Sequence, residues 1–146
     1  MKSRLIIFCI SCLVLVISNV NGQNRVVRGK VIGSEGGNFK DNPDREFWKV
    51  AGANIVYNDS ISIGTTNKHG EFELEISTNI SEIKIRSIGM AWETIPITSQ
   101  CEYLEVILIP DSNGSKRIKR KERKIIPELY RIAFKHGLIQ TPVPCR

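Results

Sequence analysis

The chain has 146 residues, 41% of them hydrophobic and 25% charged, which suits one globular domain and excludes a large multidomain protein. Its formal net charge of +6 is unevenly distributed: residues 23–115 contain nine basic and thirteen acidic residues, whereas residues 116–146 contain ten basic and two acidic ones. The sequence therefore predicts an acidic globular body that carries a basic C-terminal extension.

The N-terminal segment has the pattern of a secretory signal peptide. Lys2 and Arg4 precede an apolar run at residues 5–17, and small or aliphatic residues at Val20 and Gly22 suit signal-peptidase cleavage after Gly22. The run is shorter than the roughly 20 residues that a membrane span needs. We expect an exported product that is periplasmic, attached to the outer membrane or secreted. An uncleaved N-terminal anchor is the alternative.

The mature chain is rich in short strand patterns and turn signals. A polar, turn-rich segment at residues 33–49 is predicted to be a long loop. No helix pattern lies among the strands, which favours an all-β sandwich over residues 23–111. We expect seven strands, at residues 25–32, 52–57, 61–66, 71–76, 82–88, 92–97 and 103–109.

Residues 64–74 give the clearest single signal. A short strand leads into a tight turn, in which Gly70 is suited to a positive φ because it has no Cβ. In the next strand Phe72, Leu74 and Ile76 alternate with three glutamates, so we expect the apolar side chains in the core. In the later strand at residues 92–97, a proline predicts a sheet edge or the end of a strand.

The extension, residues 112–146, is predicted to contain one short helix over residues 127–136. Pro127 suits the first helical turn, and Gly137 suits the position after the helix ends. Leu129, Ile132 and Ala133 fall on one face at helical spacing. The basic cluster before Pro127 is expected to be mobile.

Several spaced motifs resemble those of the carboxypeptidase-regulatory-like domain family. The motifs lie at residues 27–31 (VRGKV), 51–55 (AGANI), 64–74 (GTTNKHGEFEL), 88–90 (IGM) and 104–111 (LEVILIPD). The resemblance implies a seven-stranded transthyretin-like (prealbumin-like) β-sandwich over about residues 26–111. It also implies an exported protein of Gram-negative type, with no catalytic residues of its own. Such domains often accompany TonB-dependent outer-membrane transporters, which makes such a transporter system a candidate partner.

The sequence predicts neither a catalytic centre nor a cofactor. Its two histidines, His69 and His136, lie far apart in sequence, and neither has the neighbouring ligands that a zinc peptidase motif supplies. We expect His69 in a turn and His136 at the end of a helix. No metal site, cofactor or enzymatic activity is therefore predicted.

Aromatic residues supply one candidate binding surface. Three of them lie in or next to the predicted loop and the fourth begins the sixth strand, as follows: Phe39, Phe47, Trp48 and Trp92. Aromatic side chains of this kind can bind a glycan or a peptide, but they can equally cap one end of the core.

The basic cluster supplies a second candidate surface. It comprises Lys116, Arg117, Lys119, Arg120, Lys121, Arg123 and Lys124. A positive run attracts anionic lipid or an acidic partner, although the attraction alone is weak and salt-sensitive. Nucleic acid is not expected as a partner of an exported protein. A solvated tail is the alternative.

Two cysteines remain once the predicted signal peptide is removed. Cys101 and Cys145 would then share a compartment in which disulfides form, and a bridge between them is one candidate. The other candidate is a mobile tail, with both cysteines present as free thiols.

These features favour a non-enzymatic, exported accessory module of the cell envelope that binds a protein partner. The alternative is a carbohydrate- or peptide-binding module that uses the aromatic residues of the 33–49 loop. The sequence predicts neither the identity of the ligand nor the oligomeric state.

Overall fold

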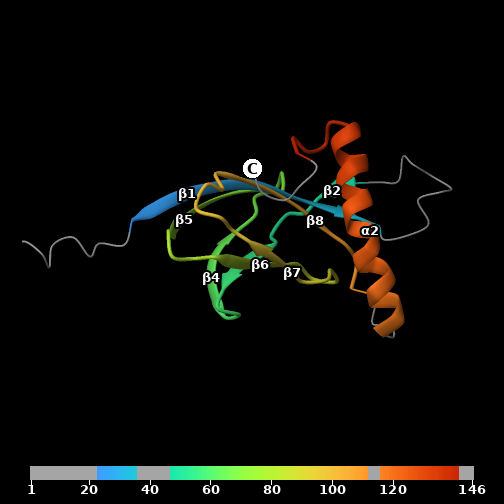
Figure 1. Cartoon of the computed structure of the whole chain (residues 1–146), viewed down its shortest axis with the longest axis horizontal. Helices are drawn as coiled ribbons and strands as arrows, with labels where there is room; N and C mark the ends of the chain where they lie inside the picture. Colours follow the sequence, from blue (N-terminus) through green and yellow to red (C-terminus); the bar gives the residue numbers. More distant parts are fainter. Residues whose placement is uncertain (1–22, 36–46, 112–115, 142–146) are drawn as a thin grey trace, which may run out of the picture.

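Eight strands and one long helix make up the described part of the chain (Figure 1). The computed structural model describes residues 23–35, 47–111 and 116–141, with only the backbone for residues 116–123. The elements are β1 (Asn24–Ser34), β2 (Phe47–Lys49), β3 (Asn54–Tyr57), β4 (Ile61–Thr65), β5 (Glu71–Ser77), β6 (Glu82–Arg86), β7 (Glu93–Pro96), β8 (Tyr103–Leu108) and α2 (Lys116–Lys135). The predicted all-β sandwich with a helical extension is confirmed.

The first sheet, sheet A, is organised around β1. One edge of β1 pairs in parallel with β8, from Arg28 opposite Tyr103 to Gly33 opposite Leu108. Strand β5 pairs antiparallel with residues 24–30 of β1, and β2 pairs antiparallel with residues 32–34. Both stretches overlap the part of β1 that pairs with β8, so β5 and β2 lie one after the other along the opposite edge of β1. Sheet A is therefore a mixed sheet, because only its β1–β8 pair is parallel.

The second sheet, sheet B, is antiparallel throughout and has the order β4-β3-β6-β7. Its edge strand β7 ends at Pro96, as expected from the proline in this segment. Sheets A and B are linked by the turn between β4 and β5, where Gly70 has a φ of 77°. A Cβ at Gly70 would lie 2.5 Å from the carbonyl oxygen of Val31, so both the backbone conformation and the space require glycine.

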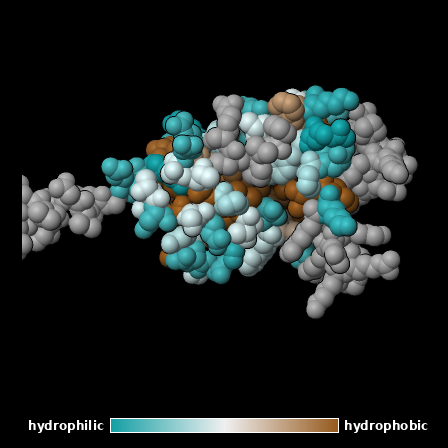
Figure 2. All heavy atoms as spheres, viewed as in Figure 1, coloured by the Kyte–Doolittle hydropathy of each residue, from teal (hydrophilic) through white to brown (hydrophobic). Residues whose placement is uncertain are grey.

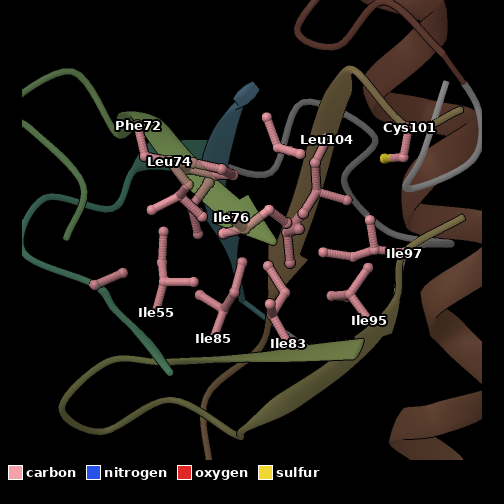
Figure 3. Packing of buried hydrophobic residues seen from close by; sticks show 14 of the residues in the cluster. Ile55, Phe72, Leu74, Ile76, Ile83, Ile85, Ile95, Ile97, Cys101 and Leu104 are labelled. Carbon is pink, nitrogen blue, oxygen red and sulfur yellow. The ribbon is translucent and has the colours of Figure 1, made fainter. Parts of the chain in front are cut away.

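The main core lies between the two sheets. The apolar side of β5, with Phe72, Leu74 and Ile76, faces side chains of sheet B that include Ile55 and Ile85 (Figure 3). All five are buried, which confirms the predicted face of β5. Seen from outside, a band of hydrophobic atoms runs between two more hydrophilic layers (Figure 2). Burial of such side chains stabilises the fold by roughly 1.5–3 kcal/mol each.

A second, smaller core lies on the outer face of sheet A, beneath α2. Ile32, Ile107 and Ile109 come from the carboxyl-terminal ends of β1 and β8, which α2 crosses (Figure 1). From α2, Leu129 and Ala133 complete the cluster and are fully buried. Leu129 and Ala133 of the predicted apolar face thus pack on the sandwich, whereas Ile132 is only half-buried and is not part of this cluster.

Two polar side chains fasten the extension to β8. The buried carboxylate of Glu105 accepts hydrogen bonds from the backbone N–H groups of Gln140 (2.7 Å) and Thr141 (3.0 Å). The hydroxyl of Tyr130 accepts from the N–H of Ile107 and donates to the carbonyl of Glu105, each at 3.1 Å. Burial raises the pKa of Tyr130 above its usual range.

Two sequence predictions about element boundaries are wrong. The segment at residues 33–49, predicted to be loop throughout, contributes the end of β1 and all of β2, so the described sandwich has eight strands rather than seven. The predicted helix start at Pro127 is also wrong, because α2 begins at Lys116 and contains Pro127 in its interior. Lysine, arginine and glutamate favour helix strongly enough to extend it through the basic cluster, although proline removes one hydrogen bond.

The end of α2 agrees with the prediction. Gly137 has a φ of 67°, its N–H donates to the carbonyl of Phe134, and the N–H of Leu138 donates to that of Ala133. This pair of bonds is a Schellman motif, for which glycine is the preferred residue.

Candidate functional site

A surface pocket at one end of sheet B is the strongest candidate site among the described residues. Its volume is about 370 Å³, and its lining comes from sheet B, the turn after β6 and the segment after β8. The segment before β3 supplies Gly52, β3 supplies Asn54, residues 86–90 form one wall, and Trp92 and Asp111 complete it. We refer to this set of residues as the Trp92 pocket.

The hairpin of β6 and β7 brings Arg86 and Trp92 together. Ile85 pairs with Glu93 in this hairpin, so Arg86 and Trp92 lie one step beyond the last registered pair. The guanidinium carbon of Arg86 lies 5.1 Å from the centroid of the Trp92 ring, a cation–π arrangement worth about 0.5–1 kcal/mol at an exposed site. None of the described residues forms an ion pair with Arg86. Its charge is therefore held in place without an ion-pair partner from the described part of the chain.

The turn after β6 presents an apolar side chain at the edge of the pocket. Ile88 is fully exposed, at a relative exposure of 102%, and the neighbouring Trp92 is 59% exposed. The turn is fixed from both sides: the N–H of Met90 donates to the carbonyl of Ser87, and the N–H of Asp111 donates to that of Gly89. Ile88 is therefore held out to solvent by an ordered turn.

Asn54 adds a hydrogen-bond donor next to Arg86. The two residues are paired across β3 and β6, so their side chains lie on the same face. The side-chain oxygen of Asn54 accepts a hydrogen bond of 2.7 Å from the hydroxyl of Ser62. This bond orients the amide and leaves its NH₂ group without a partner among the described residues.

A larger surface pocket of about 440 Å³ lies near Arg28 and Glu73. Its one cation is already paired, since Arg28 Nε lies 2.6 Å from a carboxylate oxygen of Glu73. A ligand there would have to break that pair. The Trp92 pocket is the better candidate because a ligand could bind the guanidinium of Arg86 without breaking an ion pair with another described residue.

The predicted aromatic surface is only partly assembled by the structure. Phe47 packs against the core beneath α2, whereas Trp48 lies over Gly33 on the sandwich side of sheet A. The two neighbours therefore point to opposite faces, as alternation along a strand requires. Trp92 joins Arg86 instead, and Phe39 lies outside the described residues.

The remaining predicted residues have varied positions. His69 is exposed in the turn before β5, and His136 follows the last residue of α2. The basic cluster lies in the first half of α2, where Lys124 is exposed and the other side chains lie outside the described residues. Cys101 is buried and disulfide-bonded. Cys145 lies outside the described residues, so its pairing with Cys101 stays a prediction.

Sequence reasoning singled out Trp92 but not Arg86, Ile88 or Asn54. A signal for Arg86 is present: it lies near the end of the strand predicted at residues 82–88, and Trp92 begins the next predicted strand after a short turn. In a hairpin such positions face each other. The exposure of Ile88 has no local signal, because isoleucine is usually buried.

The described residues contain no group of three or more His, Cys, Asp or Glu side chains placed to bind a metal ion. No helix within them has the length and apolar character needed to cross a membrane. Comparison of the sequence with models of known families and with curated proteins finds no match.

Proposed function

We propose that this protein is a non-enzymatic, exported accessory module of the cell envelope that binds a protein partner through the Trp92 pocket. The observation that carries the proposal is the pairing of a fully exposed Ile88 with a largely exposed Trp92 at one pocket. Exposed aromatic and aliphatic side chains next to a charged group are typical of the centre of a protein interface.

The chemistry of the pocket supports binding rather than catalysis. Its described lining offers one guanidinium, one carboxylate, one amide and apolar side chains, with no histidine, cysteine or pair of carboxylates. General acid–base and nucleophilic catalysis depend on such groups. The signal-peptide pattern supports export, and the family resemblance favours a TonB-dependent transporter system as the partner.

Site-directed photo-crosslinking tests this function. A photoreactive amino acid at Ile88 should give a discrete crosslinked product in intact cells that express the full chain. The same substitution at Ile61, which is 53% exposed on the edge strand β4, provides a matched control and should give none. Equal crosslinking at both positions, or none at Ile88, would contradict the proposal.

A further inference from the structure

We propose that the Trp92 pocket binds a carboxylate group of a peptide, with Arg86 as the anchoring cation. This inference rests on the proposed function and adds the chemical class of the ligand. Its starting point is that Arg86 is half-buried and has no ion-pair partner among the described residues. A guanidinium in that state binds carboxylates well, because its planar donors match the two carboxylate oxygens.

The surroundings of Arg86 limit how it can move. Its guanidinium lies against one face of Trp92, and its strand is paired on both sides, with Asn54 in β3 and with β7. Little side-chain entropy therefore remains to be lost on binding, which is the main cost of forming an exposed ion pair. The unpartnered NH₂ group of Asn54 provides a further donor on the same face.

The rest of the lining favours a peptide. Asp111 is the one acidic residue among the described lining residues, and it can accept an N–H group of a bound main chain. Ile88, Met90 and the Trp92 ring supply apolar surface for a side chain next to the bound carboxylate. A C-terminal residue with an apolar side chain carries all three features: carboxylate, N–H and apolar group.

The test compares two small probes that differ only in their terminal group, which is charged in one and neutral in the other. N-acetyl-leucine carries the carboxylate, whereas N-acetyl-leucinamide has a neutral amide in its place. Each is titrated into the ¹⁵N-labelled mature chain while the Arg86 Nε–H and Trp92 indole resonances are followed by NMR. We expect N-acetyl-leucine to shift both resonances and to bind at least tenfold more tightly than the amide.

Variants assign the effect to Arg86. Arg86→Gln should reduce the preference for the carboxylate to less than twofold, while the amide binds as before. Lys84→Gln is the matched control, because Lys84 lies on the same strand but pairs with Asp59, and it should keep the preference. The NMR spectrum of each variant verifies that it is folded.

Three outcomes would overturn the inference: equal affinity for the two probes, no binding of either, or an unchanged preference in Arg86→Gln. Tighter binding of methyl glucuronide than of N-acetyl-leucine would also overturn it, in favour of an anionic glycan. The crosslinking result at Ile88 does not depend on any of these titrations. Failure of the carboxylate assignment is therefore distinguishable from failure of the proposed function.

Discussion

The outer faces of the two sheets differ in what covers them. The outer face of sheet A carries α2, whose Leu129 and Ala133 complete a second core, and Glu105 and Tyr130 add buried hydrogen bonds. The outer face of sheet B carries no helix from the described residues. The difference fits a division of roles under the proposed function: the covered face stabilises the fold, and the open face, with the Trp92 pocket, would bind the partner.

The core between the sheets should be the most sensitive place in the molecule. Replacing Phe72, which is 7% exposed, with alanine should lower the free energy of unfolding by about 3–5 kcal/mol, because it leaves a cavity between the sheets. Denaturant unfolding measures the loss. A loss below about 1 kcal/mol would show that the ring is not part of the core.

The disulfide of Cys101, which lies in the main core, bears on the covered face only through its partner. If its partner is Cys145, the bridge closes a loop of about 45 residues and stabilises by roughly 4 kcal/mol in the chain-entropy model. Thiol titration of the denatured, non-reduced mature protein should then find no free thiol. Two titratable thiols in protein taken from its native compartment would rule out the bridge and favour a mobile tail.

Glu105 tests how firmly the C-terminal segment is held to sheet A. Glu105→Gln keeps the shape but replaces a charged acceptor of two N–H bonds with a neutral one, so we expect a loss of about 1–2 kcal/mol. Hydrogen exchange at Gln140 and Thr141 should accelerate. Glu73→Gln, at an exposed glutamate on β5 of the same sheet, should change stability by less than about 0.5 kcal/mol. Similar losses in the two variants would contradict the assignment.

Tyr130 gives the covered face a dependence on alkaline pH. Its pKa is raised in the folded protein, mainly by burial, so the folded state binds this proton more tightly than the unfolded state. The contribution is complete below the usual tyrosine pKa of about 10 and is lost as pH rises toward the folded value. Stability measured above pH 10 should therefore fall.

The variant Tyr130→Phe is the control for this effect. It should cost about 1 kcal/mol at neutral pH, through loss of the two hydroxyl hydrogen bonds, and should fall less steeply above pH 10. An identical alkaline profile in wild type and variant would assign the effect to other groups.

The open face should show the smallest change in stability. Ile88→Ser removes an exposed side chain that buries nothing, so the free energy of unfolding should change by less than about 0.5 kcal/mol. Crosslinking or binding of the partner should nevertheless decrease. A large loss of stability would mean that Ile88 belongs to the fold and not to a binding surface.

Local patterns predicted the strands that carry their own signals. Alternation gave the buried face of β5, and the glycine requirement placed the turns at Gly70 and Gly137. The strand β2 was missed because Phe47–Lys49 becomes a strand only by pairing with the far end of β1, which a local pattern does not encode. The predicted helix start at Pro127 is wrong because a local proline signal does not account for the rest of the helix. The free-energy cost of a proline inside a helix is outweighed here by helix-favouring residues on both sides.

The candidate site was predictable only in part. Trp92 attracted notice as an aromatic residue, but its neighbour is a cation rather than another aromatic ring. The register of β3 with β6 places Asn54 opposite Arg86. This register is set by the packing of the whole sheet, so a local sequence pattern does not predict it. In β8, Glu105 lay within a strand predicted to be buried, yet the two N–H groups that satisfy it come from the chain beyond α2.

The parallel pairing of β1 with β8 has a consequence for how the chain folds. Arg28 meets Tyr103 and Gly33 meets Leu108, so sheet A cannot be completed until nearly the whole sandwich sequence has been synthesised. Pairing between strands so distant in sequence is slow, because the entropy of a long loop must be lost before the contact forms. A nascent chain would stay without its central sheet during that time. The proposed export needs a chain that is still unfolded when it reaches the membrane, and a topology that delays folding would meet that need.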